Sequence, residues 1–233
     1  MKYVLIIFAL FLLAGPIYAD FVITPKVAEI DRLSSEAFSK LKFFKTTETM
    51  CKNDNCATTY AEINRIEDKA YFKIVTGDDV VEGYIIGGIT YLKGSGPRID
   101  INTWRRAKTI PITISQMLSP KRCSLENCLR MCPNNTPDKI LLENEIIDGQ
   151  EYYILNIIYP KQGKNDSVTF TNKIFYQNNT YSPHKQNLTM ESSQFKISIE
   201  NKYYDYDVPL EIQLPPEAIN AKEVSPEELK SLR

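Results

Sequence analysis

The fold is decided by an apolar stretch with three glycines, which reads Glu82-Gly83-Tyr84-Ile85-Ile86-Gly87-Gly88-Ile89-Thr90-Tyr91-Leu92. It lies within a longer strand-like segment, Val80 to Lys93. Glycine inside a strand often marks a bulge or a bend. A sheet needs such positions where it curls tightly. We therefore expect one long strand that bends here, within a strongly curved sheet.

Strand and turn signals continue on both sides of this stretch. Alternating or β-branched runs, separated by turn residues, favour antiparallel hairpins. The expected strands are Phe43–Met50, Thr58–Ile66, Lys69–Thr76, Ile140–Ile147, Glu151–Tyr159, Val168–Gln177, Tyr181–Glu191 and Phe195–Tyr206. The expected turns include Gly77-Asp78-Asp79, Asp148-Gly149 and Asn178-Asn179, and Gly94 to Pro97 reads as a loop.

Helical signals occur at three places. Apolar residues recur at roughly helical spacing from Pro25 to Leu41, and Pro25 suits the first turn of a helix. Residues 102–132 depart from the strand pattern and suggest one or two short helices, interrupted by Pro111 and Pro120. Ser225-Pro226-Glu227-Glu228 predicts the start of a short C-terminal helix.

Together these signals predict an α+β, mainly β fold with about eight to eleven strands, a size at which a sheet curls or closes. We expect a strongly curved antiparallel sheet, or half-barrel, with an N-terminal helix and the helical insertion covering its concave face. No internal repeat is evident, which favours a single domain over residues 20–233.

Residues 1–19 have the order of a secretory signal peptide. Lys2 gives a positive start, Val4 to Ala14 is an uninterrupted apolar run, and Ala19 is a small residue at a suitable cleavage position. The apolar run is too short to span about 30 Å of hydrocarbon comfortably. We expect cleavage after Ala19 and an extracytoplasmic protein that is secreted, periplasmic or at the cell surface. An uncleaved membrane anchor is the alternative.

Composition argues against several classes of function. The chain has 28 Lys and Arg against 29 Asp and Glu, so its charge gives no reason to expect nucleic acid as a partner. Its 14 Tyr and 10 Phe, against one His and one Trp, favour strands and aromatic surfaces. The single imidazole, His184, lacks a nucleophile motif around it, and the chain has no phosphate-binding glycine loop. We expect no enzymatic activity and no cofactor.

Five cysteines occur, at Cys51, Cys56, Cys123, Cys128 and Cys132. Outside the cytoplasm, disulfides are the default expectation. Cys51 and Cys56 flank a strong turn sequence, so a bridge closing that turn is the preferred pairing. One further pair and one free thiol is the simple count, with Cys123 and Cys132 as candidates, although sequence does not fix the connectivity. A metal site is the alternative, but the spacings differ from those of zinc knuckles, and we expect no metal.

Four Asn-x-Ser/Thr sequons begin at Asn134, Asn165, Asn178 and Asn187. They would carry sugars only in a host that glycosylates exported chains. Chance occurrence in an Asn-rich sequence is the alternative. Any site that is used must be exposed.

Three stretches resemble a known family. The first is Asp79 to Tyr91. The second is Lys173 to Lys185, with Tyr181-Ser182-Pro183 where the family has an acidic turn followed by Leu-Pro. The third is Tyr203 to Ala218, which resembles the family's closing strand and its Pro-Pro-Glu-Ala ending. With the order helix, hairpins, insertion and hairpins, the chain resembles the lipoprotein-carrier superfamily of LolA- and LppX-like proteins. The Cys-rich residues 123–132 depart from the family, and no residue is placed as its cavity arginine.

The resemblance implies a non-enzymatic carrier that holds a lipid or a lipoprotein acyl chain, with a membrane-associated donor or acceptor protein as a further partner. From the sequence pattern, the cavity candidates are Tyr84, Ile86, Trp104, Met117, Leu118, Ile157 and Phe175. A slip of one residue would move each of them to the other face of the sheet. A cell-surface structural or adhesive β-module with a filled core is the alternative, and an exported hydrolase that uses His184 is a third.

Overall fold

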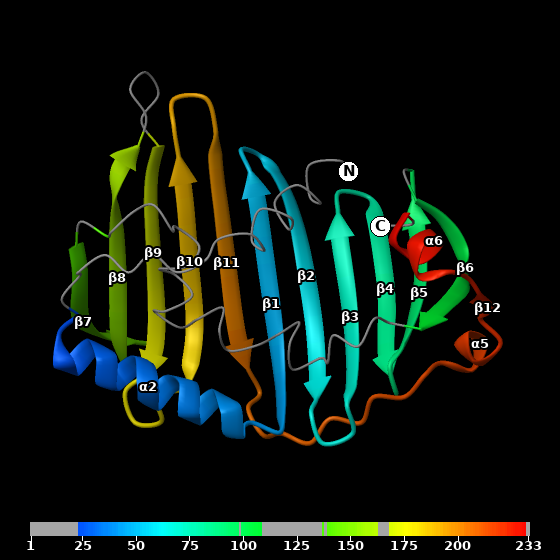
Figure 1. The fold of residues 1–233 in the computed structure, drawn as a ribbon, viewed down its shortest axis with the longest axis horizontal. Helices are drawn as coiled ribbons and strands as arrows, with labels where there is room; N and C mark the ends of the chain where they lie inside the picture. Colours follow the sequence, from blue (N-terminus) through cyan, green and yellow to red (C-terminus); the bar gives the residue numbers. More distant parts are fainter. Residues whose placement is uncertain (1–22, 98, 109–136, 138, 163–167, 232–233) are drawn as a thin grey trace. The chain divides into compact units, whose positions relative to one another are not determined.

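The structure is a computed structural model that describes residues 23–97, 99–108, 137, 139–162 and 168–231. Its elements are α2 (Pro25–Lys40), β1 (Phe43–Lys52), β2 (Asn55–Asn64), β3 (Lys69–Thr76), β4 (Asp79–Ile86), β5 (Ile89–Gly96), β6 (Ile99–Lys108), β7 (Lys139–Ile147), β8 (Gln150–Gln162), β9 (Val168–Gln177), β10 (Pro183–Glu191), β11 (Lys196–Tyr204), α5 (Pro216–Ile219), β12 (Lys222–Glu223) and α6 (Pro226–Ser231). The expected mainly β character and the early helix are confirmed (Figure 1). Within these residues, no helix combines the length and the apolar character that crossing a membrane requires.

The chain divides into two compact units. Hydrogen-bonded neighbours run in the order β12-β6-β5-β4-β3-β2-β1-β11-β10-β9-β8-β7. Unit 1 comprises the described residues within 1–40 and 120–199, which give α2 and β7 to β10. Unit 2 comprises those within 41–119 and 200–233, which give β1 to β6 and the C-terminal elements. Strand β11 contributes residues to both units.

In unit 2, β1 to β6 form an antiparallel meander, in which cross-strand partners lie on the same face. The first face, called the apolar face below, carries Phe44, Thr46, Ala61, Ile63, Ala70, Phe72, Ile74, Val81, Gly83, Ile85, Thr90, Leu92, Arg105 and Ala107. The second, called the tyrosine face, carries Lys45, Tyr60, Glu62, Tyr71, Lys73, Glu82, Tyr84, Tyr91 and Trp104.

In unit 1, β7 to β10 are also antiparallel neighbours. Their first face carries Tyr153, Leu155, Ile157, Tyr159, Phe170, Asn172, Ile174, Tyr176, Gln186 and Leu188. Helix α2 lies on this side, with Lys26 Nζ 5.6 Å from the centre of the Tyr153 ring, so we call it the α2 face (Figure 1). The opposite face holds a cluster of Tyr152, Ile154 and Phe175.

Helix α2 begins at Pro25 as expected and ends at Lys40. Its buried side chains are Val27, Ile30, Ser34 and Phe38, whose spacing of three and four residues places them on one side of the helix. The apolar periodicity from which the helix was predicted is therefore the pattern of its burial.

Two expectations for unit 2 are wrong. Val80 to Lys93 is not one bent strand, because Gly87 and Gly88, at φ +57° and +74°, form a tight turn between β4 and β5. Two adjacent residues with positive φ suit a two-residue hairpin turn, and Gly-Gly can supply both. Strand β5 also continues to Gly96, through the expected loop.

The helical insertion is corrected in its first part. Residues 102–108 belong to β6 and pair with β5. Residues 109–132 lie outside the described residues. The aromatic and apolar side chains of this part, Trp104 among them, therefore serve a strand and not a helix.

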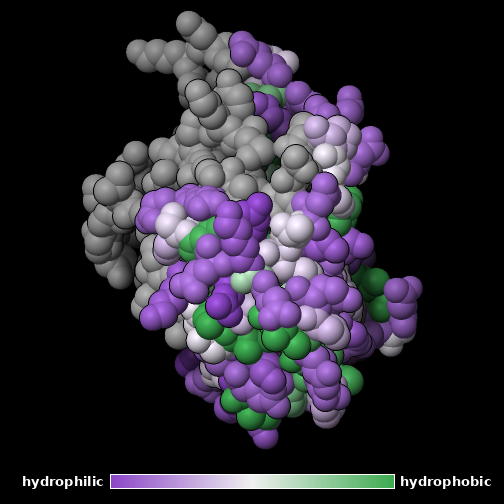
Figure 2. All heavy atoms as spheres, turned by 90° about the vertical axis from the view of Figure 1, so that its right-hand side faces the viewer, coloured by the Kyte–Doolittle hydropathy of each residue, from purple (hydrophilic) through white to green (hydrophobic). Residues whose placement is uncertain are grey.

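The C-terminal segment of unit 2 follows β1 to β6 and ends beside β6. Asn64 Nδ2 donates to the Leu210 carbonyl at 3.0 Å, and the Asp207 amide donates to the Phe43 carbonyl at 2.9 Å. Beyond α5, β12 pairs in parallel with β6 at Arg105 and Arg106. Seen from this side, the surface is mainly hydrophilic, with hydrophobic side chains gathered in the lower part (Figure 2). The expected C-terminal helix is confirmed as α6.

Candidate functional site

The apolar face of unit 2 carries small side chains between larger ones. Ala61, Ala70, Thr90 and Ala107 are each at most 4 % exposed. A central row runs from Ala61 through Phe72 and Gly83 to Leu92 in cross-strand register. This face is therefore apolar and buried, with small side chains packed beside rings and branched side chains.

Gly83 is required by packing at the centre of that row. A Cβ atom at this position would lie 2.3 Å from Phe72 Cζ and 2.7 Å from Leu92 Cδ2. Both distances are far below a van der Waals contact. Because Gly83 has no side chain, the Phe72 ring can pack directly against the backbone of β4 on the apolar face.

A single guanidinium group stands at the end of the row. Arg105 is the cross-strand partner of Leu92, and its Nε atom is buried without a hydrogen-bond partner. Its Nη1 lies 3.8 Å from Glu228 Oε1 in α6. At that separation the pair is a loose ion pair, so this end of the row is polar.

On the tyrosine face, rings contact one another from strand to strand. The centres of Tyr60 and Tyr71 are 6.1 Å apart, those of Tyr71 and Tyr84 are 5.1 Å apart, and those of Tyr84 and Trp104 are 5.7 Å apart. Burial, followed by the charge of Glu82, raises the pKa of Tyr71 to about 12. Trp104 packs on Ala218 and Ala221 of the C-terminal segment.

Three predicted cavity residues therefore lie on this second face. Tyr84 and Ile86 are two residues apart in β4 and therefore point to the same side of the sheet. Tyr84 contacts Trp104. Ile85, between them, points to the apolar face and is 7 % exposed. The structure brings Tyr84 and Trp104 together, but as part of a packed aromatic surface.

The two predicted cavity residues of unit 1 lie on opposite faces. Ile157 is fully buried on the α2 face, opposite Asn172. Phe175 pairs with Ile154 and packs with Tyr152 on the other side. The two side chains cannot line one cavity, because the sheet itself lies between its two faces.

The α2 face also has a buried amide pair within its apolar surroundings. Gln186 Nε2 donates to Asn172 Oδ1 at 3.2 Å, and the two residues are 3 % and 0 % exposed. Buried amides need hydrogen-bond partners, and this bond between β9 and β10 supplies one to each side chain.

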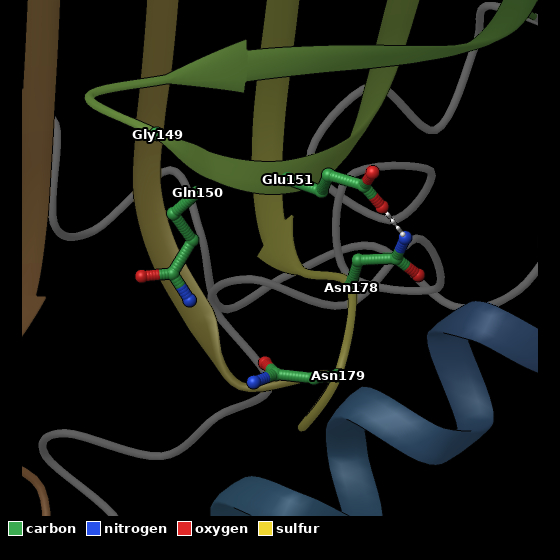
Figure 3. A pocket seen from close by; sticks show the side chains of 5 residues that line it. All are labelled: Gly149, Gln150, Glu151, Asn178 and Asn179. Carbon is green, nitrogen blue, oxygen red and sulfur yellow. Dashed lines mark hydrogen bonds between the residues drawn. The ribbon is translucent and has the colours of Figure 1, made fainter.

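A pocket lies at the turns of unit 1. It has a volume of about 560 Å³ and is lined by Gly149, Gln150, Glu151, Asn178 and Asn179 (Figure 3). We call it the turn pocket. The first three residues come from the β7–β8 turn and the start of β8, and the other two from the turn after β9.

The disulfide between Cys51 and Cys56 is confirmed, with an S–S distance of 2.01 Å. The two cysteines are direct cross-strand partners in the β1–β2 hairpin. Several other predictions concern residues that are not described: the signal peptide at 1–19, Met117, Leu118, Cys123, Cys128, Cys132, Asn134 and Asn165.

Two sequon asparagines are described, and both are half-buried. Asn178 Nδ2 donates to Glu151 Oε2 at 2.7 Å, and Asn187 Oδ1 is buried. His184 lies against the ring of Tyr152, with 4.9 Å between ring centres. No group of three or more His, Cys, Asp or Glu side chains that could hold a metal ion occurs in the described part of the chain.

Sequence reasoning missed three features of these surfaces. The roles of Gly83 and Arg105 depend on cross-strand register, which no local pattern encodes. The turn pocket joins residues far apart in sequence. Its only sequence signals were the turn dipeptides Asp148-Gly149 and Asn178-Asn179, which mark turns and not their proximity.

The sequence matches no protein-family model and no curated protein. Among solved structures, lipoprotein LppX of Mycobacterium tuberculosis is similar over 82 % of this chain and 100 % of its own, at 12 % identity and a TM-score of 0.51. The chain has the fold of LppX. The expected resemblance in fold to LolA- and LppX-like proteins and the mainly β fold class are thereby confirmed.

Two other solved structures are similar at lower scores. An uncharacterised conserved protein from Thermus thermophilus matches over 86 % of this chain and 99 % of its own, at 8 % identity and a TM-score of 0.42. MucB, in complex with MucA(peri), matches over 82 % of this chain and 60 % of its own, at 11 % identity and a TM-score of 0.41.

Proposed function

We propose that this protein is an exported, non-enzymatic binder or carrier of a hydrophobic ligand, a lipid or an acyl chain. The observation that carries the proposal is the apolar face of β1 to β6, in a chain with the fold of LppX. The small side chains of this face and the Phe72 ring, which packs over Gly83, suit a long, flexible hydrocarbon.

The energetics of such a ligand follow from area burial. Each methylene moved from water to an apolar surface contributes about 0.8 kcal/mol. An acyl chain lying across several strands therefore needs no strong polar contact to bind. It needs only an apolar surface of sufficient length, and the side chains of the row from Ala61 to Leu92 are apolar.

Export belongs to the same proposal. The Cys51–Cys56 disulfide suits an oxidising compartment, and residues 1–19 have the pattern of a signal peptide. A carrier in that compartment would receive its ligand from a membrane-associated donor or deliver it to an acceptor.

The direct test is extraction of lipid from the purified mature protein, followed by mass spectrometry. A fluorescent fatty acid then gives affinities for two matched variants in β3. Ile74→Trp fills space on the apolar face, and Lys73→Trp places the same ring on the opposite face. We expect Ile74→Trp to weaken binding at least tenfold and Lys73→Trp to leave it unchanged. Circular dichroism checks that both variants fold.

A cell-surface structural or adhesive module with a filled core is the second candidate. It is favoured by the near-complete burial of Phe44, Ile63 and Leu92, each at most 1 % exposed. That function predicts no extracted lipid and no fatty-acid binding. It also predicts that Ile74→Trp lowers stability without changing any affinity.

A further inference from the structure

The turn pocket belongs to unit 1, whereas the apolar face belongs to unit 2, and the chemistry of the two is different. The described residues that line the pocket offer two amides at Gln150 and Asn179 and a carboxylate at Glu151. Figure 3 shows the Gln150 and Asn179 side chains facing a common space, with the Glu151–Asn178 pair beside them. Its volume of about 560 Å³ lies in the range of small-molecule sites.

The pocket is held in shape by its own hydrogen bonds. The Asn178 amide N–H donates to the Glu151 carbonyl at 3.1 Å, and its side chain donates to the Glu151 carboxylate at 2.7 Å. Asp148 and Gly149 have φ values of +51° and +80°, which fix the first turn. Tyr181, at φ +58°, closes the second turn by donating its N–H to the Gln177 carbonyl. Pre-organised groups lose little entropy when they bind a ligand.

The lining narrows the class of ligand. None of the five described lining residues has a large apolar side chain, so these residues give an acyl chain little to pack against. The only charged group among them is the Glu151 carboxylate, which repels phosphates and other anions. A single carboxylate is too few oxygen ligands for a divalent cation.

What remains is a ligand that both donates and accepts hydrogen bonds without carrying charge. Amides offer donors and acceptors together, and a carboxylate accepts from hydroxyl groups. Ring stacking contributes little, because the nearby Tyr153 is already stacked on Tyr181 and carries Lys26 over its ring. Hydroxyl groups at several positions of one ligand match this arrangement.

We propose that the turn pocket binds a neutral, polyhydroxylated ligand of the sugar class. This site is additional to the hydrophobic-ligand site and does not depend on it. Gln150 and Asn179 contact the hydroxyl groups directly. Asn178 is a positioning residue that holds the Glu151 carboxylate in place.

The test is titration of the isotope-labelled mature protein with methyl glycosides of glucose, galactose, mannose and N-acetylglucosamine, and with lactose and cellobiose. Amide signals in the two turns are followed by NMR. We expect at least one sugar to shift the signals of residues 149–151 and 178–179 in a saturable manner. Gln150→Ala and Asn179→Ala should each weaken that binding about tenfold, the loss expected for one hydrogen bond.

The matched control is Gln194→Ala, which removes an exposed amide from another turn of the same unit. It should leave the sugar affinity unchanged. The proposal is overturned if no sugar in the panel shifts these signals, or if Gln150→Ala and Asn179→Ala bind sugar as the unmodified protein does. Saturable binding of inorganic phosphate or calcium at the same residues, with no response to sugars, would also overturn it.

Discussion

Gly83 shows how one residue type sets the packing of several strands. A substitution to alanine there adds a single methyl group within 2.3 Å of the Phe72 ring and 2.7 Å of Leu92. Because both neighbours are buried, the clash cannot be relieved toward solvent. We expect Gly83→Ala to lower the free energy of unfolding by about 1–3 kcal/mol, measured by urea denaturation.

The Phe72→Leu background provides the control. A shorter side chain removes the ring atoms that the new methyl group would meet. Gly83→Ala should therefore cost less in that background, although the contact with Leu92 remains, and a double-mutant cycle measures this coupling. Equal costs in both backgrounds would mean that the Phe72 ring is not the obstacle.

Tyr71 makes a second prediction at the residue scale. Burial, and then Glu82, raise its pKa from an ordinary value near 10 to about 12. The folded protein thus binds the phenolic proton more tightly than the unfolded chain does. The resulting stabilisation is complete below pH 10 and is lost as the pH rises through about 12.

Difference absorbance of the phenolate band, between the unmodified protein and Tyr71→Phe, isolates this titration from the other tyrosines. The titration that is present in the unmodified protein and absent in Tyr71→Phe should be centred well above pH 10. A centre near the ordinary pKa would show that the ring is more solvated than its contacts with Tyr60 and Tyr84 imply.

At this scale the sequence predicted apolar residues well and their directions poorly. Ile157 and Phe175 are both buried, as an apolar pattern suggests, yet they point to opposite faces. Burial on both faces removes the polar alternation that would otherwise reveal direction. Tyr84 and Trp104 contact each other within the tyrosine face.

Among the elements, hairpins with polar turns were the most predictable. The β1–β2 turn contains Asn53 and Asp54, and the β7–β8 turn contains Asp148 and Gly149. Such residues adopt turn conformations at little cost. The Gly87-Gly88 turn was missed because its flanking residues are apolar on both sides, so the run read as one strand.

Strand β6 was missed for a different reason. Its first half contains Ile99, Ile101 and Thr103, which favour strands, but Arg105 to Lys108 do not, and prolines follow soon afterwards. Pairing with β5 and with β12 decides its conformation. The residues of β6 alone do not indicate that these two strands will pair with it.

The hairpin disulfide gives a prediction at the element scale. Replacing both Cys51 and Cys56 by serine removes a short covalent loop between paired strands. Chain-entropy arguments give a loss of stability of about 2 kcal/mol for a loop of this size. Urea denaturation of the double variant and of the reduced unmodified protein, each compared with the oxidised unmodified protein, measures it. A loss in one and not the other would indicate that the serines act by another route.

The C-terminal segment gives a second prediction at this scale. Trp104 is the only tryptophan of the chain and packs on this segment, so its fluorescence reports on that packing. Truncation after Pro215 removes Ala218 and Ala221, which pack on its ring. We expect the fluorescence emission to shift to longer wavelength and its quenching by acrylamide to rise. Truncation after Ser225 removes α6 but keeps both alanines, so it should change the emission little. An unchanged spectrum in the longer truncation would contradict the packing described for α5.

For the molecule as a whole, the first question is where the mature chain begins. We propose that residues 1–19 are removed on export, so that the mature chain starts at Asp20. Intact-mass measurement of the exported protein tests this. A mass that retains residues 1–19 would favour the anchored form instead, with the ligand site held close to a membrane.

The parallel pairing of β12 with β6 has one more consequence, for behaviour at high concentration. Unpaired strand borders act as templates on which identical chains can stack into fibres. In this protein Lys222 and Glu223 occupy part of that border, and the Val224 amide donates to the Arg106 carbonyl at 2.9 Å. Residues 222–224 thus cover part of this border, and their removal would expose backbone groups of β6 to pairing with other chains.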